Sequence, residues 1–426
     1  MTFTIDLSPP HPAQVNAWQG RSRYTALRCG RRWGKTQLAI SILVQKAAQG
    51  EFWGLFAPDY KILSETYREL EYLLRPIIAS SSKIDGIIRL VTGGRIDFWT
   101  LNNPRAGRSR KYHGVVIDEA AFAGPDMADI WTKAIKPTLL DYGGVAWAMS
   151  TPAGKSDTNW FYNICNPGNE VVVGERWTEF HAPTHTNPYL PAAEIAQLQV
   201  ENAPDVFRQE YLAEFVDWNG VSIFPQEHFL IDGEPVPCPN PIDFVFATID
   251  TGVKTGSQND GTAVVFYAVN NLIPIPLYVL DWDIIQIQGD LLDSWLPGIF
   301  ERLEQFAREC GARYGSNGAF IEDKASGMVL VQQALRRGWP VEGIDSKLTA
   351  VGKDERALST SSYHHQGLCK ITPHAFAKTV IYKGRSANHF LSQVCGFRLG
   401  VKDQADDLLD CLTYGLAGAL GDAQWF

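Results

Sequence analysis

A glycine-containing loop between an apolar segment and an amphipathic one constrains the fold of this chain more than any other feature. The loop reads Cys29-Gly30-Arg31-Arg32-Trp33-Gly34-Lys35-Thr36 and follows the apolar segment 24–29. Such loops turn backbone N–H groups toward phosphate oxygens, while a lysine reaches the outer phosphates and a hydroxyl binds Mg²⁺. Cys29 replaces the usual first glycine, so the pattern is a variant. The residues expected to bind nucleotide are Gly30, Arg31, Arg32, Gly34, Lys35 and Thr36.

A second apolar segment ends in two carboxylates, Val115-Val116-Ile117-Asp118-Glu119. Asp118 is expected to hold the Mg²⁺ of the nucleotide, together with Thr36, and Glu119 to polarise the attacking water. The alternative is an acidic strand end that leads into a helix N-terminus, where carboxylates are favoured. The two elements together predict a site that hydrolyses ATP with Mg²⁺.

Several other residues are candidates for the same site. Gln14 is a candidate for reading the adenine edge, or else a surface residue. Ser150-Thr151 ends the next apolar segment and is a candidate coupling element that senses the γ-phosphate, or else a strand cap. An arginine finger is expected among the arginines near the loops, although a solvated or phosphate-contacting role is the alternative for each. These candidates are Arg32, Arg105, Arg108 and Arg110, with Arg31 as a further option.

Length and pattern predict two α/β domains. A chain of 426 residues exceeds one ordinary core, and strands alternate with helices in its first half, which predicts a mostly parallel sheet. A proline-rich stretch near 225–241 is the best linker candidate. Strands at 244–251, 262–269 and 276–282 then form a meander, followed by a helix at 290–310 and a strand at 319–322. The expected domains are 1–216 and 241–426, joined by a linker at 217–240.

Composition limits the class of protein. The net charge of −9 argues mildly against an indiscriminate nucleic-acid binder, but a local basic groove would still bind DNA. No apolar run reaches the roughly 18 residues of a membrane helix, and the N-terminus lacks the layout of a signal peptide. The seven cysteines are scattered without a C-x-x-C pair, which is compatible with a reducing cytoplasm.

Carboxylates in the second half predict a second active site. Asp250 ends an apolar strand, Glu322 ends another, and Asp406-Asp407 open an amphipathic helix. Carboxylates at such positions can converge on two cations about 4 Å apart that activate water and stabilise a leaving oxygen. Oxygen ligands indicate Mg²⁺ or Mn²⁺ rather than zinc. The alternatives are a turn cap for Asp250 and helix-dipole partners for Asp406 or Asp407.

Together these motifs, in this order, resemble the large terminase subunit of tailed bacteriophages. Further segments resemble the family as well, namely Ala57-Pro58-Asp59-Tyr60, Asn187-Pro188-Tyr189-Leu190, Phe207-Arg208-Gln209-Glu210-Tyr211 and Lys353-Asp354-Glu355-Arg356. The resemblance implies an additional-strand P-loop ATPase domain and a ribonuclease H-like nuclease domain. It also implies that Asp250, Glu322 and Asp407 or Asp406 bind the metals that cut DNA.

The resemblance further implies what such a protein does and with what. It would hydrolyse ATP to translocate double-stranded DNA into a procapsid, and would cut that DNA in the host cytoplasm. The implied partners are a small terminase subunit, the portal ring of the procapsid, and further copies of the chain, as a pentamer on the portal. The state in solution, including monomer, is left open, and so is the choice between Asp406 and Asp407.

Two other classes of protein share some of these features. A helicase–nuclease of DNA repair or defence would carry both sites, but it would also need further helicase motifs and usually a second motor domain. A non-enzymatic DNA-binding module with a degenerate nucleotide fold would be expected to have lost some of Lys35, Thr36, Asp118 and Glu119, yet all four are present.

Overall fold

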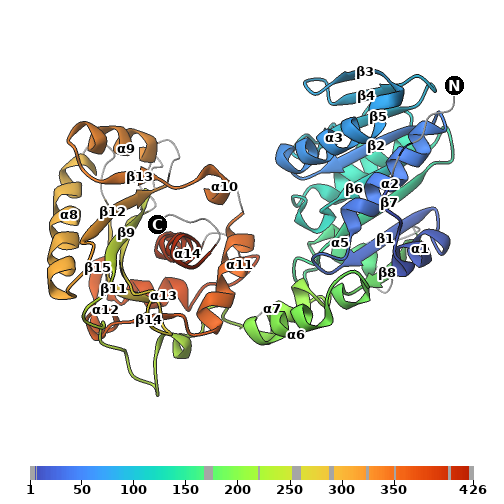
Figure 1. The fold of residues 1–426 in the computed structure, drawn as a ribbon. Coiled ribbons are helices and arrows are strands. Elements are labelled where there is room, and N and C mark those ends of the chain that lie inside the picture. The colour runs from blue at the N-terminus through green and yellow to red at the C-terminus, as the bar shows by residue number, and fades with distance from the viewer. Residues whose placement is uncertain are drawn as a thin grey trace. The chain divides into compact units, whose positions relative to one another are not determined.

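The computed structural model describes residues 5, 7–166, 176–218, 221–251, 261–286, 292–322, 326–349, 352–401 and 404–421. They form two compact units, each built on its own large sheet (Figure 1). The first unit extends to Gln199 and includes Pro204–Asp217, and the second contains Val200–Ala203 and the chain from Trp218 onward. Within the described residues, no helix is both long and apolar enough to cross a membrane.

The first unit contains an eight-stranded sheet in the order β3-β4-β5-β2-β6-β7-β1-β8. Its strands are β1 (Tyr24–Cys29), β2 (Phe52–Ala57), β3 (Ile78–Ser82), β4 (Ile87–Leu90), β5 (Arg95–Thr100), β6 (Gly114–Asp118), β7 (Val145–Ser150) and β8 (Thr178–Ala182). Its helices are α1 (Pro12–Gln19), α2 (Lys35–Ala48), α3 (Tyr60–Leu74), α4 (Met127–Ile130), α5 (Trp160–Cys165), α6 (Ala192–Glu201) and α7 (Pro204–Glu210).

The strand order of this sheet confirms the predicted ATPase fold class. Six strands, from β5 through β8 in the sheet order, run parallel to one another, whereas β4 runs antiparallel to both of its neighbours, β3 and β5. The strand before the glycine-containing loop, β1, does not pair with the acidic strand β6, because β7 lies between them. This inserted strand is the additional strand of the predicted class. Parallel strands bring the loops after β1, β6 and β7 to one edge of the sheet.

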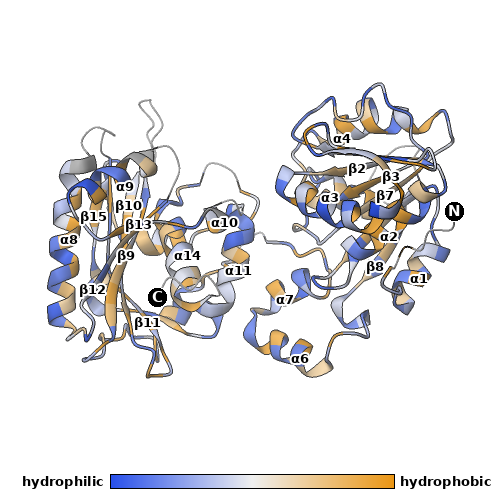
Figure 2. Cartoon of the chain, turned by 45° about the horizontal axis from the view of Figure 1, so that its top comes forward, coloured by the Kyte–Doolittle hydropathy of each residue, from blue (hydrophilic) through white to orange (hydrophobic). Residues whose placement is uncertain are grey.

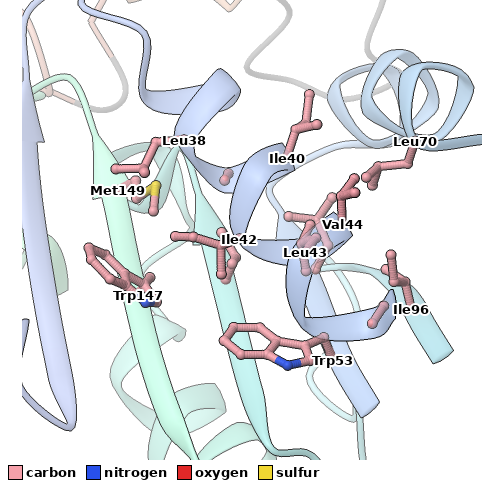
Figure 3. Packing of buried hydrophobic residues seen from close by; sticks show 14 of the residues in the cluster. Leu38, Ile40, Ile42, Leu43, Val44, Trp53, Leu70, Ile96, Trp147 and Met149 are labelled. Carbon is pink, nitrogen blue, oxygen red and sulfur yellow. The ribbon is translucent and has the colours of Figure 1, made fainter. Parts of the chain in front are cut away.

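Helix α2 fixes the glycine-containing loop on the sheet through its apolar side. Leu38 and Ile42 face Trp147 and Met149 of β7, while Val44 approaches Leu70 of α3 (Figure 3). Burial of a large apolar side chain stabilises a fold by about 1.5–3 kcal/mol. The first residue of α2, Lys35, is therefore held on a densely packed element.

The second unit contains a six-stranded sheet in the order β13-β12-β9-β10-β11-β14 and a separate hairpin of β15 and β16. Its strands are β9 (Phe244–Thr251), β10 (Thr262–Val269), β11 (Leu277–Ile285), β12 (Ser316–Ile321), β13 (Val341–Gly343), β14 (Cys369–Ile371), β15 (Val380–Tyr382) and β16 (Arg385–Ala387). Its helices are α8 (Leu292–Glu309), α9 (Ser326–Arg336), α10 (Ser346–Thr349), α11 (Lys353–His365), α12 (Pro373–Ala377), α13 (His389–Val394) and α14 (Asp407–Leu420).

This second sheet has the ribonuclease H-like arrangement that was predicted. The meander β9-β10-β11 is antiparallel, and β12 and β13 are added in parallel on the other side of β9. Apolar residues are concentrated along these strands, while the outer face of α8 is hydrophilic (Figure 2). Strand β9, which carries Asp250, therefore lies in the interior of the sheet, where its side chains are buried on both faces.

Helix α14 packs closely on this sheet. Thr248 Oγ1 and Tyr267 Oη both donate to the carbonyl oxygen of Cys411, at 2.9 and 3.0 Å. A Cβ atom at Gly415 would lie 2.4 Å from the ring of Tyr267, so only glycine permits this approach. The start of the helix is held as well, because the N–H of Leu408 donates to Gln393 Oε1 at 2.8 Å. Asp407, the first residue of α14, is thereby placed over the carboxyl end of β9.

Residues from the predicted linker range 217–240 pack on the second unit. His364 Nε2 lies 2.8 Å from the carbonyl oxygen of Pro225, and Lys370 Nζ donates to the carbonyl oxygens of His228 and Leu230. The N–H of Val236 donates to Ile371 O at 2.9 Å. The domain limits set out above remain a prediction, and these contacts place the described part of that range from Pro225 onward against the second sheet and α11.

Candidate active sites

The loop between β1 and α2 follows a tight backbone path. Arg32 and Gly34 have positive φ angles of 62° and 100°. Glycine adopts such angles without steric cost, whereas arginine does not. Cys29 is fully buried, and this burial raises the pKa of its thiol. The loop leads directly into the N-terminus of α2, where unpaired backbone N–H groups and the helix dipole favour a phosphate.

Lys35 meets the acidic end of β6 at this edge of the sheet. Lys35 Nζ lies 2.8 Å from Glu119 Oε1, and Thr36, the next residue of α2, acts on the Asp118 carboxyl group to lower its pKa. Burial lowers the pKa of Lys35, but the charges of Glu119 and Asp118 outweigh it, so the pKa is raised overall. Burial, with the charge of Glu119, raises the pKa of Asp118 to about 6. The structure thus brings these four predicted residues together.

Glu119 is held in an unusual backbone conformation and contacts the end of β7. Its φ angle is 50°, in the left-handed region. Ser150 Oγ lies 3.3 Å from Glu119 Oε2 and 2.7 Å from the carbonyl oxygen of Thr151, and it accepts the N–H of Ala121 at 3.1 Å. Ser150 is fully buried. Its contact with Glu119 joins the predicted coupling segment, Ser150-Thr151, to the carboxylate that is expected to orient water.

The glycine-containing loop is braced from outside by the segment 182–187 and by the end of α7. The hydrogen bonds are Gly30 N–H to Ala182 O (2.9 Å), Arg31 N–H to Glu210 O (2.7 Å), Thr184 Oγ1 to Arg31 O (2.7 Å) and Asn187 Nδ2 to Arg32 O (2.9 Å). The Arg31 side chain also pairs with Glu210. The loop conformation is therefore tied to α7, the last helix of the first unit.

Gln14 lies against the loop in this structure. Its Nε2 donates to Gly34 O at 2.8 Å, and its Oε1 accepts the N–H of His11 at 3.0 Å. His11 and Gln14 also form the reciprocal cap at the start of α1. The side chain predicted to read adenine is thus adjacent to the nucleotide loop, with its amide hydrogen-bonded to the protein.

The arginine-finger candidates fall into two groups. Arg32, Arg105 and Arg108 are exposed. Arg110 is half-buried, with its Nε 3.5 Å from Asp97 Oδ2 and its guanidinium over the ring of Trp99. The ion pair with the buried Asp97 carboxylate holds the Arg110 side chain in place. The exposed arginines Arg32, Arg105 and Arg108 are therefore the better candidates for an arginine finger.

The carboxylates predicted for the second site meet at the end of β9. Strands β9 and β12 are parallel with Ile249 opposite Ile321, so the following residues, Asp250 and Glu322, share one sheet edge. The Glu322 side chain lies close enough to Asp250 for its charge to act on that carboxyl group. Burial raises the pKa of Asp250 well above its ordinary value, and the charges of Asp410, Glu322 and Asp407 act in the same direction. A bound cation would relieve this repulsion.

Glu322 is held by its neighbours on two sides. Tyr414 Oη donates to Glu322 Oε1 at 2.9 Å. On the other side α9 begins so close that a Cβ at Gly327 would lie 1.7 Å from the Glu322 carbonyl oxygen. Glycine at that position lets the turn after β12 pass close to the site.

Two cations of α11 face carboxylates at the N-terminal end of α14. Lys353 Nζ pairs with Asp406 and lies 3.9 Å from Asp410 Oδ2. The Arg356 guanidinium pairs with Asp410 and lies over the ring of Tyr414, 4.4 Å from its centroid. Of the two aspartates predicted as alternatives, Asp407 acts on Asp250, whereas Asp406 is engaged by Lys353.

The donor set of this second site suits a hard divalent cation. All of the converging groups are carboxylates, and oxygen is the donor that Mg²⁺ and Mn²⁺ prefer. As they stand, no three His, Cys, Asp or Glu side chains in the described part of the chain are arranged to hold a metal ion. Side-chain movements of Asp250, Glu322 and Asp407 would be needed to close a coordination shell.

Some residues of these sites were not singled out from the sequence. Thr184, Asn187 and Glu210 brace the nucleotide loop, and Lys353 and Arg356 neutralise carboxylates of α14. The sequence of these segments shows at most a family resemblance, and it does not assign a role to the individual residues. A sequence clue exists for the second set, since two cations three residues apart share one face of a helix.

Comparisons with known proteins bear on both units. No family model matches the chain. A curated relative, described as the large subunit of the terminase of Escherichia phage T5, is 24% identical over 216 residues, which is 50% of this chain and 48% of that protein. The chain thus matches about half the length of that relative.

Solved structures extend the likeness to the whole chain. The large terminase of the thermophilic bacteriophage D6E has a TM-score of 0.65 at 14% identity, covering 97% of this chain and 100% of the other. The same protein with ATP-γ-S has a TM-score of 0.64 at 14% identity, covering 96% and 99%. The resemblance predicted from the motifs is confirmed, and both units have the fold of a phage large terminase.

Proposed function

We propose that this chain is the motor and nuclease subunit that packages double-stranded viral DNA. In this proposal it hydrolyses ATP to translocate the DNA into a procapsid, and it cuts the DNA with a two-metal site. The observation that carries the proposal is the presence of both sites in one chain whose two units have the fold of a phage large terminase. The ATP-γ-S complex of the D6E protein supports a nucleotide at the first site.

The residues of the first unit have distinct parts in ATP hydrolysis. Mg²⁺, held through Thr36 and Asp118, would neutralise charge on the outer phosphates. Lys35 now pairs with Glu119, and an incoming phosphate would compete for its ammonium group. Glu119, released from that pair but still contacted by Ser150, would then orient the attacking water. Binding of the nucleotide would thereby free Glu119, the residue that orients the water for hydrolysis.

The second unit supplies the cutting site. Asp250, Glu322 and Asp407 would hold two Mg²⁺ or Mn²⁺ ions, which activate water and stabilise the leaving oxygen. Tyr414 keeps Glu322 oriented through its hydroxyl, and the buried strand β9 fixes Asp250. Contacts to DNA would be mainly to phosphates, because a motor must pass every sequence, and binding would weaken with salt.

The wider setting follows from the same proposal. Partners would be a small terminase subunit, the portal ring, and other copies of this chain arranged as a pentamer, in the cytoplasm of the host. An exposed arginine, Arg32, Arg105 or Arg108, would reach the nucleotide of its own or a neighbouring subunit. Engaging it would accelerate hydrolysis by about 10³–10⁵-fold, as arginine fingers do.

The test separates the two sites. Purified wild type, Lys35→Ala and Asp250→Ala are incubated with plasmid DNA and Mn²⁺ or Mg²⁺, while ATP turnover is followed. Lys35→Ala should lose ATP turnover and keep cutting, and Asp250→Ala should do the reverse. ATP turnover without metal-dependent cutting in the wild type would contradict the nuclease assignment, and cutting without ATP turnover would contradict the motor.

A further inference from the structure

We propose that Lys353 acts as a tethered cation that competes with metal ions for the carboxylates of the cutting site. This inference rests on the proposed function of that site. In this structure the ammonium group of Lys353 pairs with Asp406 and lies 3.9 Å from Asp410 Oδ2. Asp410 belongs to α14, the helix that begins at Asp407, and Asp406 is the residue immediately before that helix. Lys353 therefore supplies positive charge where the proposed metal ions would supply it.

The two cations of α11 differ in a way that assigns this part to Lys353. The Arg356 side chain is 5% exposed, and it is fixed by Thr413 Oγ1 and the ring of Tyr414 as well as by Asp410. The Lys353 side chain is 36% exposed. A lysine ammonium is a point charge on a flexible stem, whereas a guanidinium held on several sides is not easily moved. Arg356 is thus a permanent support, and Lys353 can swing out.

The consequence concerns how tightly the site binds metal. Asp406 and Asp410 flank Asp407 at the start of α14, and their charge contributes to the field that draws a divalent cation to the site. While Lys353 neutralises that charge, an arriving cation is attracted less strongly. Metal binding therefore requires that the ion pair between Lys353 and these carboxylates breaks and that its stabilising free energy is lost. The free energy of that pair is subtracted from the free energy of metal binding.

The same competition provides a restraint on cutting. A motor that cut DNA during translocation would destroy its own substrate. The cutting site should therefore not be occupied by metal ions at all times. With Lys353 in place, loading requires a higher metal concentration, or a DNA phosphate that draws the ammonium group away. Because α11 supplies the cation and α14 the carboxylates, the restraint is contained in the second unit.

The experiment measures Mn²⁺ binding to the full chain by isothermal titration calorimetry without DNA or nucleotide. Binding that Asp250→Ala removes is assigned to the cutting site. Lys353→Met removes the charge and keeps the length of the side chain, and it should tighten this component by at least about tenfold, equivalent to about 1.4 kcal/mol. Lys353→Arg keeps the charge and should bind as wild type does. Lys383→Met is the matched control, because Lys383 lies over the ring of Tyr382 in the same unit, and its affinity should not change.

The outcomes are distinct. Tighter Mn²⁺ binding in Lys353→Met alone supports the competition. Unchanged or weaker binding in Lys353→Met, with the Asp250-dependent component intact in the wild type, overturns it and makes Lys353 a support for the carboxylates. If Asp250→Ala removes no Mn²⁺ binding, the metal site of the proposed function fails instead. Thermal denaturation of each variant verifies that it is folded.

Discussion

At the residue scale, the first site is organised around a small buried hydroxyl. Ser150 Oγ contacts the Glu119 carboxylate and accepts a backbone N–H from the turn after it. Glu119 itself has a positive φ angle, which costs about 1–3 kcal/mol and persists only where the surroundings impose it. The Ser150 hydroxyl therefore helps to keep the Glu119 carboxylate in position, although the backbone conformation of Glu119 is unfavourable.

Removing this hydroxyl should slow hydrolysis more than it weakens binding. Ser150→Ala leaves Lys35 and Thr36 intact but removes the contact that would hold the Glu119 side chain once a phosphate displaces it from Lys35. We expect kcat for ATP to fall about five- to thirtyfold, the effect of one hydrogen bond of about 1–2 kcal/mol, with little change in nucleotide affinity. Steady-state kinetics and a nucleotide-binding titration test this, with the half-buried Ser156→Ala as control. A matching loss of affinity would show that Ser150 supports the whole loop.

A buried histidine should make the second unit sensitive to acid. Burial lowers the pKa of His364 to about 3, and nearby His228, Lys370 and His365 act in the same direction, while an unfolded histidine has a pKa of about 6.5. Between these values the unfolded chain binds a proton that the folded one does not. The free energy of unfolding should therefore fall as the pH falls below about 6.5, by up to about 1.4 kcal/mol per pH unit.

The variant His364→Gln tests this pH dependence. It removes the titrating ring and keeps a donor for the Pro225 carbonyl oxygen. Calorimetry at pH 7 and 5.5 should show a smaller decrease of Tm in the variant than in the wild type for the transition of the second unit. Equal decreases would assign the pH dependence to other groups.

Sequence reasoning identified some of these residues and missed others for a physical reason. Lys35, Asp118 and Glu119 are found because each follows an apolar strand whose end must lie at one edge of a parallel sheet. The partner of a loop carbonyl follows no such pattern. Asn187 reaches the carbonyl of Arg32 across 155 positions of sequence, and only the folded chain shows which polar side chain arrives there.

At the scale of elements, the nucleotide loop depends on a segment far away in sequence. Thr184 donates to the carbonyl oxygen of Arg31, and its backbone N–H bonds to Tyr211 O beyond α7. Gly30 is pressed so closely against Thr184 that a Cβ there would lie 2.3 Å from Thr184 Oγ1. The loop, the segment 182–187 and α7 therefore form one packed assembly.

Breaking one bond of this assembly should weaken ATP binding. Thr184→Val keeps the shape of the side chain and removes its donor, which leaves the Arg31 carbonyl oxygen without that partner. We expect the first unit to lose about 1–3 kcal/mol of stability and the Kd for ATP to rise. Denaturation and nucleotide titration measure both, with His185→Ala, in the same segment but outside these contacts, as control. Wild-type affinity in Thr184→Val would show that the loop holds its conformation alone.

The elements were predicted well where their pattern was apolar and poorly where it was not. Strands β9 and β10 have the predicted bounds, because each is a continuous run of buried residues. Strand β3 was missed, since its Ile-Ala-Ser-Ser-Ser sequence is mostly exposed at the edge of the sheet. Strand β8 at the other edge was missed for the same reason. Edge strands bury one side only, so hydrophobic periodicity does not reveal them.

At the scale of the whole molecule, each unit has its own apolar core. Among the residues that the structure describes, each cluster of buried apolar side chains lies within one unit or the other. Units with separate cores and separate ligands should respond to those ligands separately. Stability measured on the full chain is therefore expected to comprise two transitions rather than one.

Ligands should distinguish these transitions. A nucleotide analogue at about one hundred times its Kd stabilises the unit that binds it by about 2.7 kcal/mol, which raises Tm by about 5–10 °C for a domain of this size. ATP-γ-S with Mg²⁺ should raise one transition, and this response should be absent in Lys35→Ala. Mn²⁺ alone should raise the other transition, except in Asp250→Ala. Equal shifts of both transitions with either ligand would contradict independent units.

Helix α14 carries a further consequence, which concerns rotation. Asp407 faces the carboxyl end of β9, and eight residues later Gly415 lies against the ring of Tyr267. An α-helix turns by about 100° per residue, so inserting or deleting one residue between them would rotate the acidic end away by more than a quarter turn. The contact at Gly415 thus sets the angular phase of the carboxylates. The cutting site should tolerate many substitutions along this helix, but no change in the number of residues between these two points.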